Sequence, residues 1–472
     1  MANQYQIGED GAVIDVAAAS VRPTSEIPVA PSVPLLGSLP WMAIDGAGFL
    51  ERVGAERGPI VRLPIGTRGM VMLSHPDDVR HVLQDAHKKY VRGGAGDLVR
   101  PIFGNGLAMS DPPFWLRQRR IMQPSFSRAR IATMAVAMNE VAGRHLAGLR
   151  DGQEVDVHRF MLHVARDVIL QTMFSEHLSP ELLQLDEALV EIDRFIKTRM
   201  LLPFKIPLSW PLPGNVRVKR ATETFDRILY GIIDRRERSG EQHGDLLDAL
   251  MGARDADTGE RMSTKELRDE VMHIFFAGHE TSANALTFAT LALTQHPQLW
   301  TELRDEVDAV LGGRAPGPED IPRLVRTGMI IRETLRLYPP AWIFTREAAE
   351  DDVIRGYAIP KGTVIMLAPI AMHRDPSLWP TPRRFDPDRF AEDPTATAAG
   401  KTWAYLPFGG GPHVCIGNHF ALLEIAIVLA RLAQCGRLVA LRPDLARPQG
   451  ASTLSVKGGL PGRFAARTAI PI

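Results

Sequence analysis

Long helical patterns dominate the middle of the chain, from Pro112 to Pro339. Apolar side chains recur there every three to four residues, which is the period of an amphipathic helix. The longest predicted helix covers residues 269–293, and Ser263 and Glu266 stand before it with the spacing of a capping box. The proline-rich run at residues 201–215 interrupts this helical region.

Shorter strand patterns lie on both sides of this region. Residues 61–66 and 70–74 predict a hairpin, and Ser74 is expected to cap the helix that follows. Further strands are expected within residues 356–369. The proline-rich stretch at residues 23–40 predicts an extended segment rather than a helix.

These patterns predict a mainly α protein with small β-sheets in a single domain. We expect a flexible lead-in over residues 1–30 and one domain over residues 31–472, closing with a long helix from Ile416 to Leu432. Of the 472 residues, 45% are apolar and 23% are charged, which excludes disordered, collagen-like and coiled-coil proteins. A core of this size can bury a cofactor.

The charge balance argues against general binding to nucleic acid or to an anionic membrane. The chain has 55 basic and 55 acidic residues, although local patches remain open. No run approaches the about 20 apolar residues of a spanning helix. With only two cysteines a disulfide framework is excluded, so we expect a cytoplasmic protein without a membrane span.

Cys415 lies where a glycine-rich loop meets the last apolar helix. Free N–H groups and the helix dipole favour a thiolate there. It could be a nucleophile, but the sequence does not show a base and an orienting acid in space. His413, Cys415 and His419 do not complete a zinc set, no CxxCH is present, and two cysteines are too few for an iron–sulfur cluster. A haem thiolate remains, beside the alternative of an inert cysteine; Cys435 is expected to be a buried packing residue.

The residues around this cysteine carry a family resemblance. Phe408, Gly411, His413, Cys415 and Gly417 match F-x-x-G-x-[RH]-x-C-x-G, so the chain resembles the cytochrome P450 family over nearly its whole length. The resemblance implies the triangular, mainly helical fold of that family and a haem b whose iron takes Cys415 as axial ligand. Many members carry arginine at the position of His413, so a weaker propionate contact is implied there.

A second motif is the pair Glu333 and Arg336, which lie three residues apart on a predicted helix. Alone, it is typical of a surface ion pair. It resembles the E-x-x-R pair of the family, which Arg389 would complete. The implied role is structural, because a buried carboxylate held by two guanidinium groups fixes the fold near the haem.

Arginines and a tryptophan provide candidate contacts for the haem propionates. Trp115 and Arg119 resemble the W-x-x-x-R helix of the family, and Arg346 matches a further propionate-binding position. Charge-assisted pairing of arginine with carboxylate is the physical reason.

The predicted long helix contains three unusual residues, Gly278, Glu280 and Thr281. Thr281 can divert its hydroxyl to a carbonyl one turn back, which widens a groove beside Gly278. The segment AGHETS resembles the family's [AG]-G-x-[DE]-T-[ST] element on the distal haem face. The resemblance implies catalytic roles: Thr281 in oxygen activation and water positioning, and Glu280 in connecting the site to solvent protons. A tolerated polar kink is the alternative, and His279 is given no role.

The substrate pocket is predicted from positions that the resemblance indicates. They are mostly apolar and carry almost no charge, so a lipophilic substrate without ionic anchors is expected. The run PPAWIFTR resembles bacterial enzymes acting on terpenes and carotenoids, and less closely fatty-acid hydroxylases. The predicted wall residues are Leu98, Ile102, Phe103, Phe276, Ala277, Ala341, Trp342, Ile343, Phe344, Thr453 and Leu454.

The resemblance implies a monooxygenase that inserts one oxygen atom from O2 into a terpenoid or related hydrocarbon. No flavin or iron–sulfur module is visible, so electrons are expected from NAD(P)H through a separate ferredoxin and ferredoxin reductase. The cluster Arg117, Arg120, Arg128 and Arg130 is a candidate docking patch for an acidic ferredoxin. A fatty-acid hydroxylase is the alternative within the family, and a non-catalytic haem-thiolate sensor or binding protein is the alternative outside it.

Overall fold

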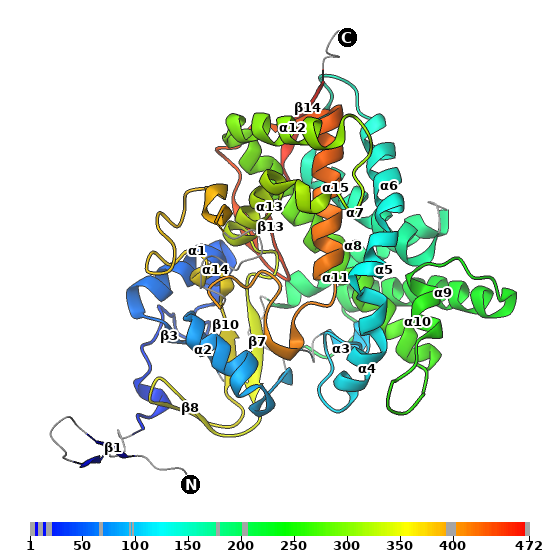
Figure 1. Ribbon diagram of the computed structural model, residues 1–472. Helices are drawn as coiled ribbons and strands as arrows, with labels where there is room; N and C mark the ends of the chain where they lie inside the picture. The colour runs from blue at the N-terminus through cyan, green and yellow to red at the C-terminus, as the bar shows by residue number, and fades with distance from the viewer. Residues whose placement is uncertain are drawn as a thin grey trace.

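The chain folds into a large helical part and a smaller part that holds the main sheet (Figure 1). This agrees with the predicted mainly α class. The computed structural model describes residues 21–65, 69–93, 96, 99–175, 180–200, 206–392 and 403–467, and the short strands β1 (Tyr5–Ile7) and β2 (Val13–Asp15).

Helix α11 (Thr264–Gln295) runs through the middle of the helical part and is packed on most sides. It contacts α7 (Val157–Phe174), α13 (Val325–Leu337) and α15 (Asn418–Cys435). Its N-terminus carries the predicted capping box, in which Ser263 and Glu266 bond each other's backbone N–H groups. The other α-helices of the described residues are α1 (Leu39–Arg57), α2 (Pro76–Arg80), α3 (Arg100–Phe103), α4 (Phe114–Met122), α5 (Arg128–Thr133), α6 (Ala135–Ala147), α8 (Pro180–Met200), α9 (Pro213–Ser239), α10 (Leu246–Gly252), α12 (Pro297–Leu311) and α14 (Pro369–Met372).

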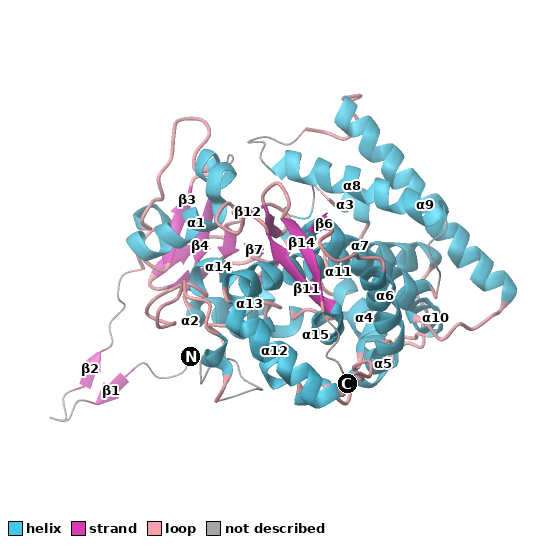
Figure 2. Cartoon of the chain, turned by 90° about the horizontal axis from the view of Figure 1, so that it is seen from above, coloured by secondary structure: helices cyan, strands magenta, loops and turns pink. Residues whose placement is uncertain are grey.

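The main sheet has the strand order β3-β4-β10-β7-β5. Figure 2 labels three of its strands, β3, β4 and β7. The predicted hairpin is its edge, since β3 (Ile60–Leu63) pairs antiparallel with β4 (Met70–Leu73). Strand β10 (Val364–Leu367) then pairs parallel to β4. The other strands are β5 (Tyr90–Val91), β6 (Glu154–Asp156), β7 (Phe344–Ala348), β8 (Asp352–Ile354), β9 (Tyr357–Ile359), β11 (Gly436–Ala440), β12 (Pro448–Gly450), β13 (Leu454–Val456) and β14 (Pro461–Ala466).

Two local expectations differ from the structure. The helix after β4 is capped by His75 and not by Ser74, because the Nδ1 atom of His75 accepts the Asp77 N–H. The N-terminal segment is packed from residue 21 onward: Ile27 and Ala30 are buried, and residues 24–26 form one turn of 3-10 helix. Part of the predicted lead-in therefore packs against the domain.

Helix α15 is long and apolar enough to cross a membrane by length and composition. Most of it is buried against α6, α11, α12 and α13 inside the protein. Its apolarity is therefore explained by its place in the core.

Candidate functional site

The cysteine loop folds tightly before α15. The backbone N–H of Cys415 donates to the Phe408 carbonyl at 2.9 Å. Gly409 and Gly411 have φ angles of 71° and 67°, which glycine adopts without strain. A Cβ atom on Gly411 would lie 1.9 Å from the carbonyl oxygen of Leu83. Glycine is thus required both for the turn and for the close approach of the loop to the neighbouring segment.

The Cys415 side chain faces the interior cavity of the protein. Burial raises the pKa of its thiol, whereas the Gly417 N–H and Arg119 lower it. Burial thus opposes the predicted thiolate, whereas the Gly417 N–H and Arg119 favour it. A metal ion bound to the sulfur would reverse this balance, because a coordinating thiol is deprotonated.

The cavity extends from the cysteine loop to α11 and has a volume of about 320 Å³. On α11 its lining includes Ala277, Gly278 and Thr281. The Thr281 hydroxyl donates to the Ala277 carbonyl at 2.6 Å, one turn back, as predicted. A Cβ atom on Gly278 would lie 2.4 Å from the Cδ1 atom of Ile169 on α7, so glycine keeps the two helices close.

One edge of the cavity is strongly cationic. Burial lowers the pKa of Arg346 to about 9 and that of Arg92 to about 10. Neither guanidinium has a carboxylate within ion-pair distance among the described residues. The Nη2 atom of Arg92 lies 3.4 Å from Nδ1 of His413, and burial together with these arginines lowers the pKa of His413 to about 3. His413 is therefore neutral and supplies a hydrogen bond without a charge.

Trp115 and Arg119, predicted as propionate contacts, lie next to the cysteine loop. The ring of Trp115 lies against that of His413, with 3.9 Å between centroids. Arg119 donates to the Val414 carbonyl at 2.9 Å and to Gln123 at 2.8 Å. Burial lowers the pKa of Arg119, and a thiolate at Cys415 would raise it. Sequence reasoning missed Arg92, which reaches this edge from beyond β5 and belongs to none of the motifs used.

These residues fit a haem. Buried guanidinium groups are costly, Asp111 is the carboxylate that raises the pKa of both Arg92 and Arg346, and none of the described residues lining the cavity carries a carboxylate. The two propionates of a haem would supply the missing anions at this edge. Cys415 could then bind the iron from the cysteine loop, and Thr281 lines the same cavity from α11.

Glu280 points away from the cavity wall toward α8. Its Oε1 atom lies 3.2 Å from the Nζ atom of Lys197, which also pairs with Asp193 at 2.6 Å. Burial raises the pKa of Glu280, and Asp193 raises it further, whereas Lys197 lowers it. Glu280 is 8% exposed, but the side chains of Lys197 and Asp193 are 35% and 25% exposed. A buried acid is thus connected to solvent, and its partners on α8 were not predicted.

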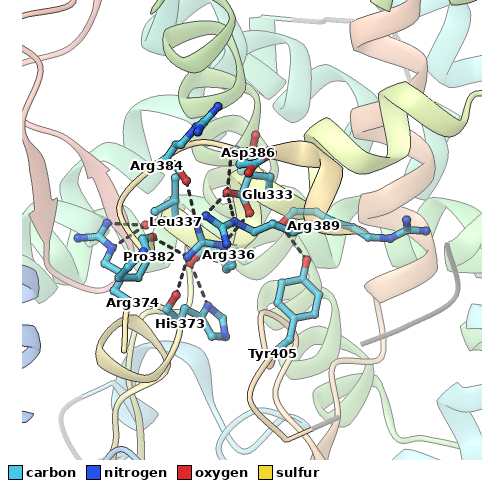
Figure 3. A network of polar contacts seen from close by, with 12 residues as sticks. Glu333, Arg336, Leu337, His373, Arg374, Pro382, Arg384, Asp386, Arg389 and Tyr405 are labelled. Carbon is cyan, nitrogen blue, oxygen red and sulfur yellow. Dashed lines mark hydrogen bonds and ion pairs between the residues drawn. The ribbon is translucent and has the colours of Figure 1, made fainter. Parts of the chain in front are cut away.

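Figure 3 shows the contacts of the E-x-x-R cluster, whose residues do not line the cavity. Glu333 and Arg336 are fully buried. Two nitrogens of Arg336 donate to the two carboxylate oxygens of Glu333, each at 2.7 Å. The Nε atom of Arg389 lies 3.4 Å from Glu333, and the Asp386 N–H donates to it at 2.9 Å. Burial raises the pKa of Glu333, and Arg336 is the largest influence that lowers it.

His373 links this cluster to the cysteine loop, a role the sequence did not reveal. Its Nδ1 atom lies 3.1 Å from the Arg336 carbonyl, and its Nε2 atom accepts the Leu406 N–H at 2.9 Å. Burial lowers the pKa of His373 to about 3. The ring is therefore neutral, donates from Nδ1 and accepts at Nε2.

The predicted substrate wall is only partly assembled at the cavity. Ala277, Ala341 and Phe344 line it, whereas Leu98 lies outside the described residues. The other predicted wall residues do not line this cavity. Ile102, Ile343 and Leu454 pack in the core, and the rings of Phe103 and Phe276 pack edge to face with 4.7 Å between centroids. Trp342 donates to the Ala451 carbonyl at 3.0 Å, and the Thr453 hydroxyl accepts from Asn284. Side chains from α7 and α11 were missed instead, including Ile169, Met173 and Ile274.

A mostly apolar cavity lined by a thiol and an alcohol, with buried cations at one edge, fits an anionic cofactor. The family model for cytochrome P450 matches residues 27–435. Cyclooctatin synthase of Streptomyces melanosporofaciens is 35% identical over 430 residues, covering 90% of this chain and 93% of that protein. Pentalenene oxygenase of Streptomyces avermitilis is 33% identical over 440 residues, covering 93% and 96%.

The chain therefore belongs to the cytochrome P450 family. It is a cytochrome P450 monooxygenase, which uses haem, O2, a lipophilic substrate and electrons from redox partners.

Proposed function

We propose that this monooxygenase binds haem b through Cys415 and hydroxylates a terpenoid or a related hydrocarbon. The observation that carries the proposal is the cavity between Cys415 and Thr281, with unpaired buried arginines at its edge. When bound, the haem supplies the iron at which O2 is reduced and from which one oxygen atom reaches the substrate. Arg92, Arg346 and His413 would hold its propionates.

Thr281 and Glu280 handle protons and water in this proposal. The Thr281 hydroxyl lies on the cavity wall and, bonded to the Ala277 carbonyl, orients its oxygen lone pairs as acceptors for a water proton. Glu280 takes up protons from solvent through Lys197 and Asp193. The raised pKa of Glu280 supports this role, because a proton donor works best when its pKa lies near the pH at which the enzyme operates.

The substrate class is supported by the lining and by the relatives. The described lining residues are almost all apolar, so burial of hydrocarbon is the main source of affinity. Cyclooctat-9-en-7-ol 5-monooxygenase of Streptomyces melanosporofaciens is 35% identical over 410 residues, and its name, like that of pentalenene oxygenase, specifies a hydrocarbon skeleton. A fatty acid fits less well unless its carboxylate pairs with one of the arginines at the cavity edge.

The electron donor is proposed to be a ferredoxin with an NAD(P)H-dependent reductase, in the cytoplasm. The predicted docking patch needs revision, because two of its arginines are already paired. Arg117 binds Glu266 at 3.0 Å, and Arg120 binds Asp255 at 3.0 Å. These two charges stabilise the fold and contribute little to a docking surface.

The other two arginines keep their charge available. Arg128 contacts His419 at 3.3 Å, four residues after Cys415. Arg130 donates only to main-chain carbonyls among the described residues, those of Gly244 and Asp245. A patch formed by Arg128 and Arg130 therefore fits an acidic ferredoxin close to the cysteine loop.

Product formation from a terpenoid panel, with purified ferredoxin and reductase, tests the proposal. Binding is expected to change the haem absorption spectrum, and oxygenated product is expected to accompany NAD(P)H consumption. Thr281→Val should lower product per NAD(P)H about tenfold or more, whereas Thr281→Ser should retain most of it. Oxygenation of fatty acids alone, or haem binding without any turnover, would contradict it.

A further inference from the structure

Two neighbouring strands bring like charges to the same edge of the cavity. Strands β5 and β7 pair antiparallel with Val91 opposite Glu347, so continuing the register places Arg92 opposite Arg346. Like charges directly opposite each other on paired strands repel. Burial lowers the pKa of Arg346, and the charge of Arg92 lowers it further. Arg92 therefore needs a contact that holds it at this edge against the repulsion.

Asp111, shortly before α4, supplies this contact. Its Oδ1 atom accepts the main-chain N–H of Arg92 at 2.7 Å. Strand β5 ends at Val91, and Gly93 has a φ angle of 62°, so the chain turns away from the strand directly after Arg92. The Asp111 carbonyl accepts the Trp115 N–H at 3.0 Å, at the start of α4. Asp111 thus joins the end of β5 to the start of α4.

The contacts of Asp111 belong to a closed circuit of four residues. The Nη2 atom of Arg92 lies 3.4 Å from Nδ1 of His413. A guanidinium only donates, so Nδ1 of His413 is the acceptor. The ring of His413 lies against that of Trp115, which returns to Asp111 through its main-chain bond. Arg92 is therefore held at both ends, its main chain by Asp111 and its guanidinium by His413.

The guanidinium of Arg92 keeps donors that the circuit does not use. It carries five N–H groups, and its contact with His413 involves only the Nη2 atom. Its Nε atom is buried and has no hydrogen-bond partner among the described residues. Asp111 binds the main chain of Arg92, and the described contacts include no ion pair between its carboxylate and the guanidinium. The free donors match the propionate proposed for this edge.

We propose that Asp111 is a positioning residue: by binding the main-chain N–H of Arg92, its carboxylate keeps the Arg92 guanidinium against His413, where it meets a haem propionate. Asp111 does not line the cavity, so it acts on the haem through Arg92. The inference rests on the proposed function, in which Arg92 holds a propionate. It follows that Asp111 contributes to haem retention only while residue 92 carries its guanidinium.

The rate at which the haem-loaded full-length enzyme passes haem to a haem-scavenging protein tests the inference. Arg92→Gln is expected to release haem about tenfold faster, the effect of one hydrogen bond to a charged group. Asp111→Ala should approach the same rate, because it frees the main chain of Arg92. Asp111→Asn keeps an oxygen that accepts the N–H and should restore most of the retention. Asp151→Ala is the matched control, because Asp151 accepts the Ala466 N–H at 2.9 Å on the surface and its loss should leave the rate unchanged.

The double variant separates a positioning role from a general structural one. If Asp111 acts through Arg92, adding Asp111→Ala to Arg92→Gln should not speed haem release further. A structural defect unrelated to Arg92 would instead multiply the two effects. If Asp111→Ala takes up no haem, the haem content of Asp111→Asn decides: recovery supports the hydrogen bond, and no recovery overturns the inference.

The inference is also overturned if Asp111→Ala releases haem at the wild-type rate, if Asp111→Asn is as fast as Asp111→Ala, or if the effects multiply in the double variant. Arg92→Gln distinguishes this failure from that of the proposed function. If Arg92→Gln is fast and Asp111→Ala is normal, only the positioning role fails. If Arg92→Gln itself releases haem at the wild-type rate, the propionate contact proposed for Arg92 fails as well.

Discussion

Arg336 binds both carboxylate oxygens of Glu333 at 2.7 Å, and neither side chain is reached by solvent. A buried ion pair adds little net stability when complete, but removing one partner leaves an uncompensated charge. Arg336 also donates to the carbonyls of His373, Pro382 and Arg384, so it ties α13 to the segment before the cysteine loop.

Glu333→Gln is therefore expected to cost about 3–5 kcal/mol of unfolding free energy and to abolish haem incorporation. Urea unfolding and the haem content of purified protein measure this. Glu154→Gln is the control, because Glu154 pairs with Arg463 at 2.7 Å on the surface and its loss should cost under about 1 kcal/mol. A Glu333→Gln protein with wild-type stability and full haem would contradict the structural role.

His373→Gln tests the link between this cluster and the cysteine loop. His373 has a pKa of about 3 in the folded protein, below the value of about 6.5 in an unfolded chain. The unfolded state therefore binds more protons between these values, and the stability contributed by the neutral ring is complete above about pH 6.5 and is lost as the pH falls toward 3. In the variant, unfolding free energy should depend less on pH over this window. An identical pH slope in both proteins would show that the ring is not buried in its neutral form.

Glu424 on α15 is predicted to give the opposite pH dependence of stability to that of His373. It is fully buried, neither carboxylate oxygen has a hydrogen-bond partner among the described residues, and burial raises its pKa to about 8. The folded state then binds the extra proton between about pH 4.5 and 8, so wild-type stability falls as the pH rises through this range. Glu424→Gln should be more stable than the wild type by about 1–3 kcal/mol at pH 8 and nearly equal at pH 5. Equal stability at both pH values would contradict the raised pKa.

Arg346→Gln tests the cationic cavity edge. Its guanidinium is buried without a carboxylate partner among the described residues, so a haem propionate is its expected counterion. We expect haem to dissociate about tenfold faster or more, measured by transfer to a haem-scavenging protein. The exposed Arg442 offers a control, since Arg442→Gln removes a charge far from the cavity lining and should leave the rate unchanged. An unchanged rate for Arg346→Gln would place the propionates elsewhere.

Motifs with short, fixed spacing were predictable from sequence. Ser263 with Glu266 and Glu333 with Arg336 lie within one helical turn, so spacing alone brings each pair together. Lys197 and Glu280 are 83 positions apart, and Arg92 and His413 are 321 apart, so only the packing of distant elements reveals them. Trp342 and Leu454 pack in the core and do not line the described cavity, because an apolar residue near a motif can face either the cavity or the core.

The central claim is that Cys415 is the axial ligand of a haem. The absorption spectrum of the reduced, CO-bound protein tests it most directly, in the wild type and in Cys415→Ala. The account predicts the long-wavelength band of thiolate-ligated haem in the wild type and its complete loss in the variant. The same band in both proteins, or a histidine-ligated spectrum in the wild type, would contradict it.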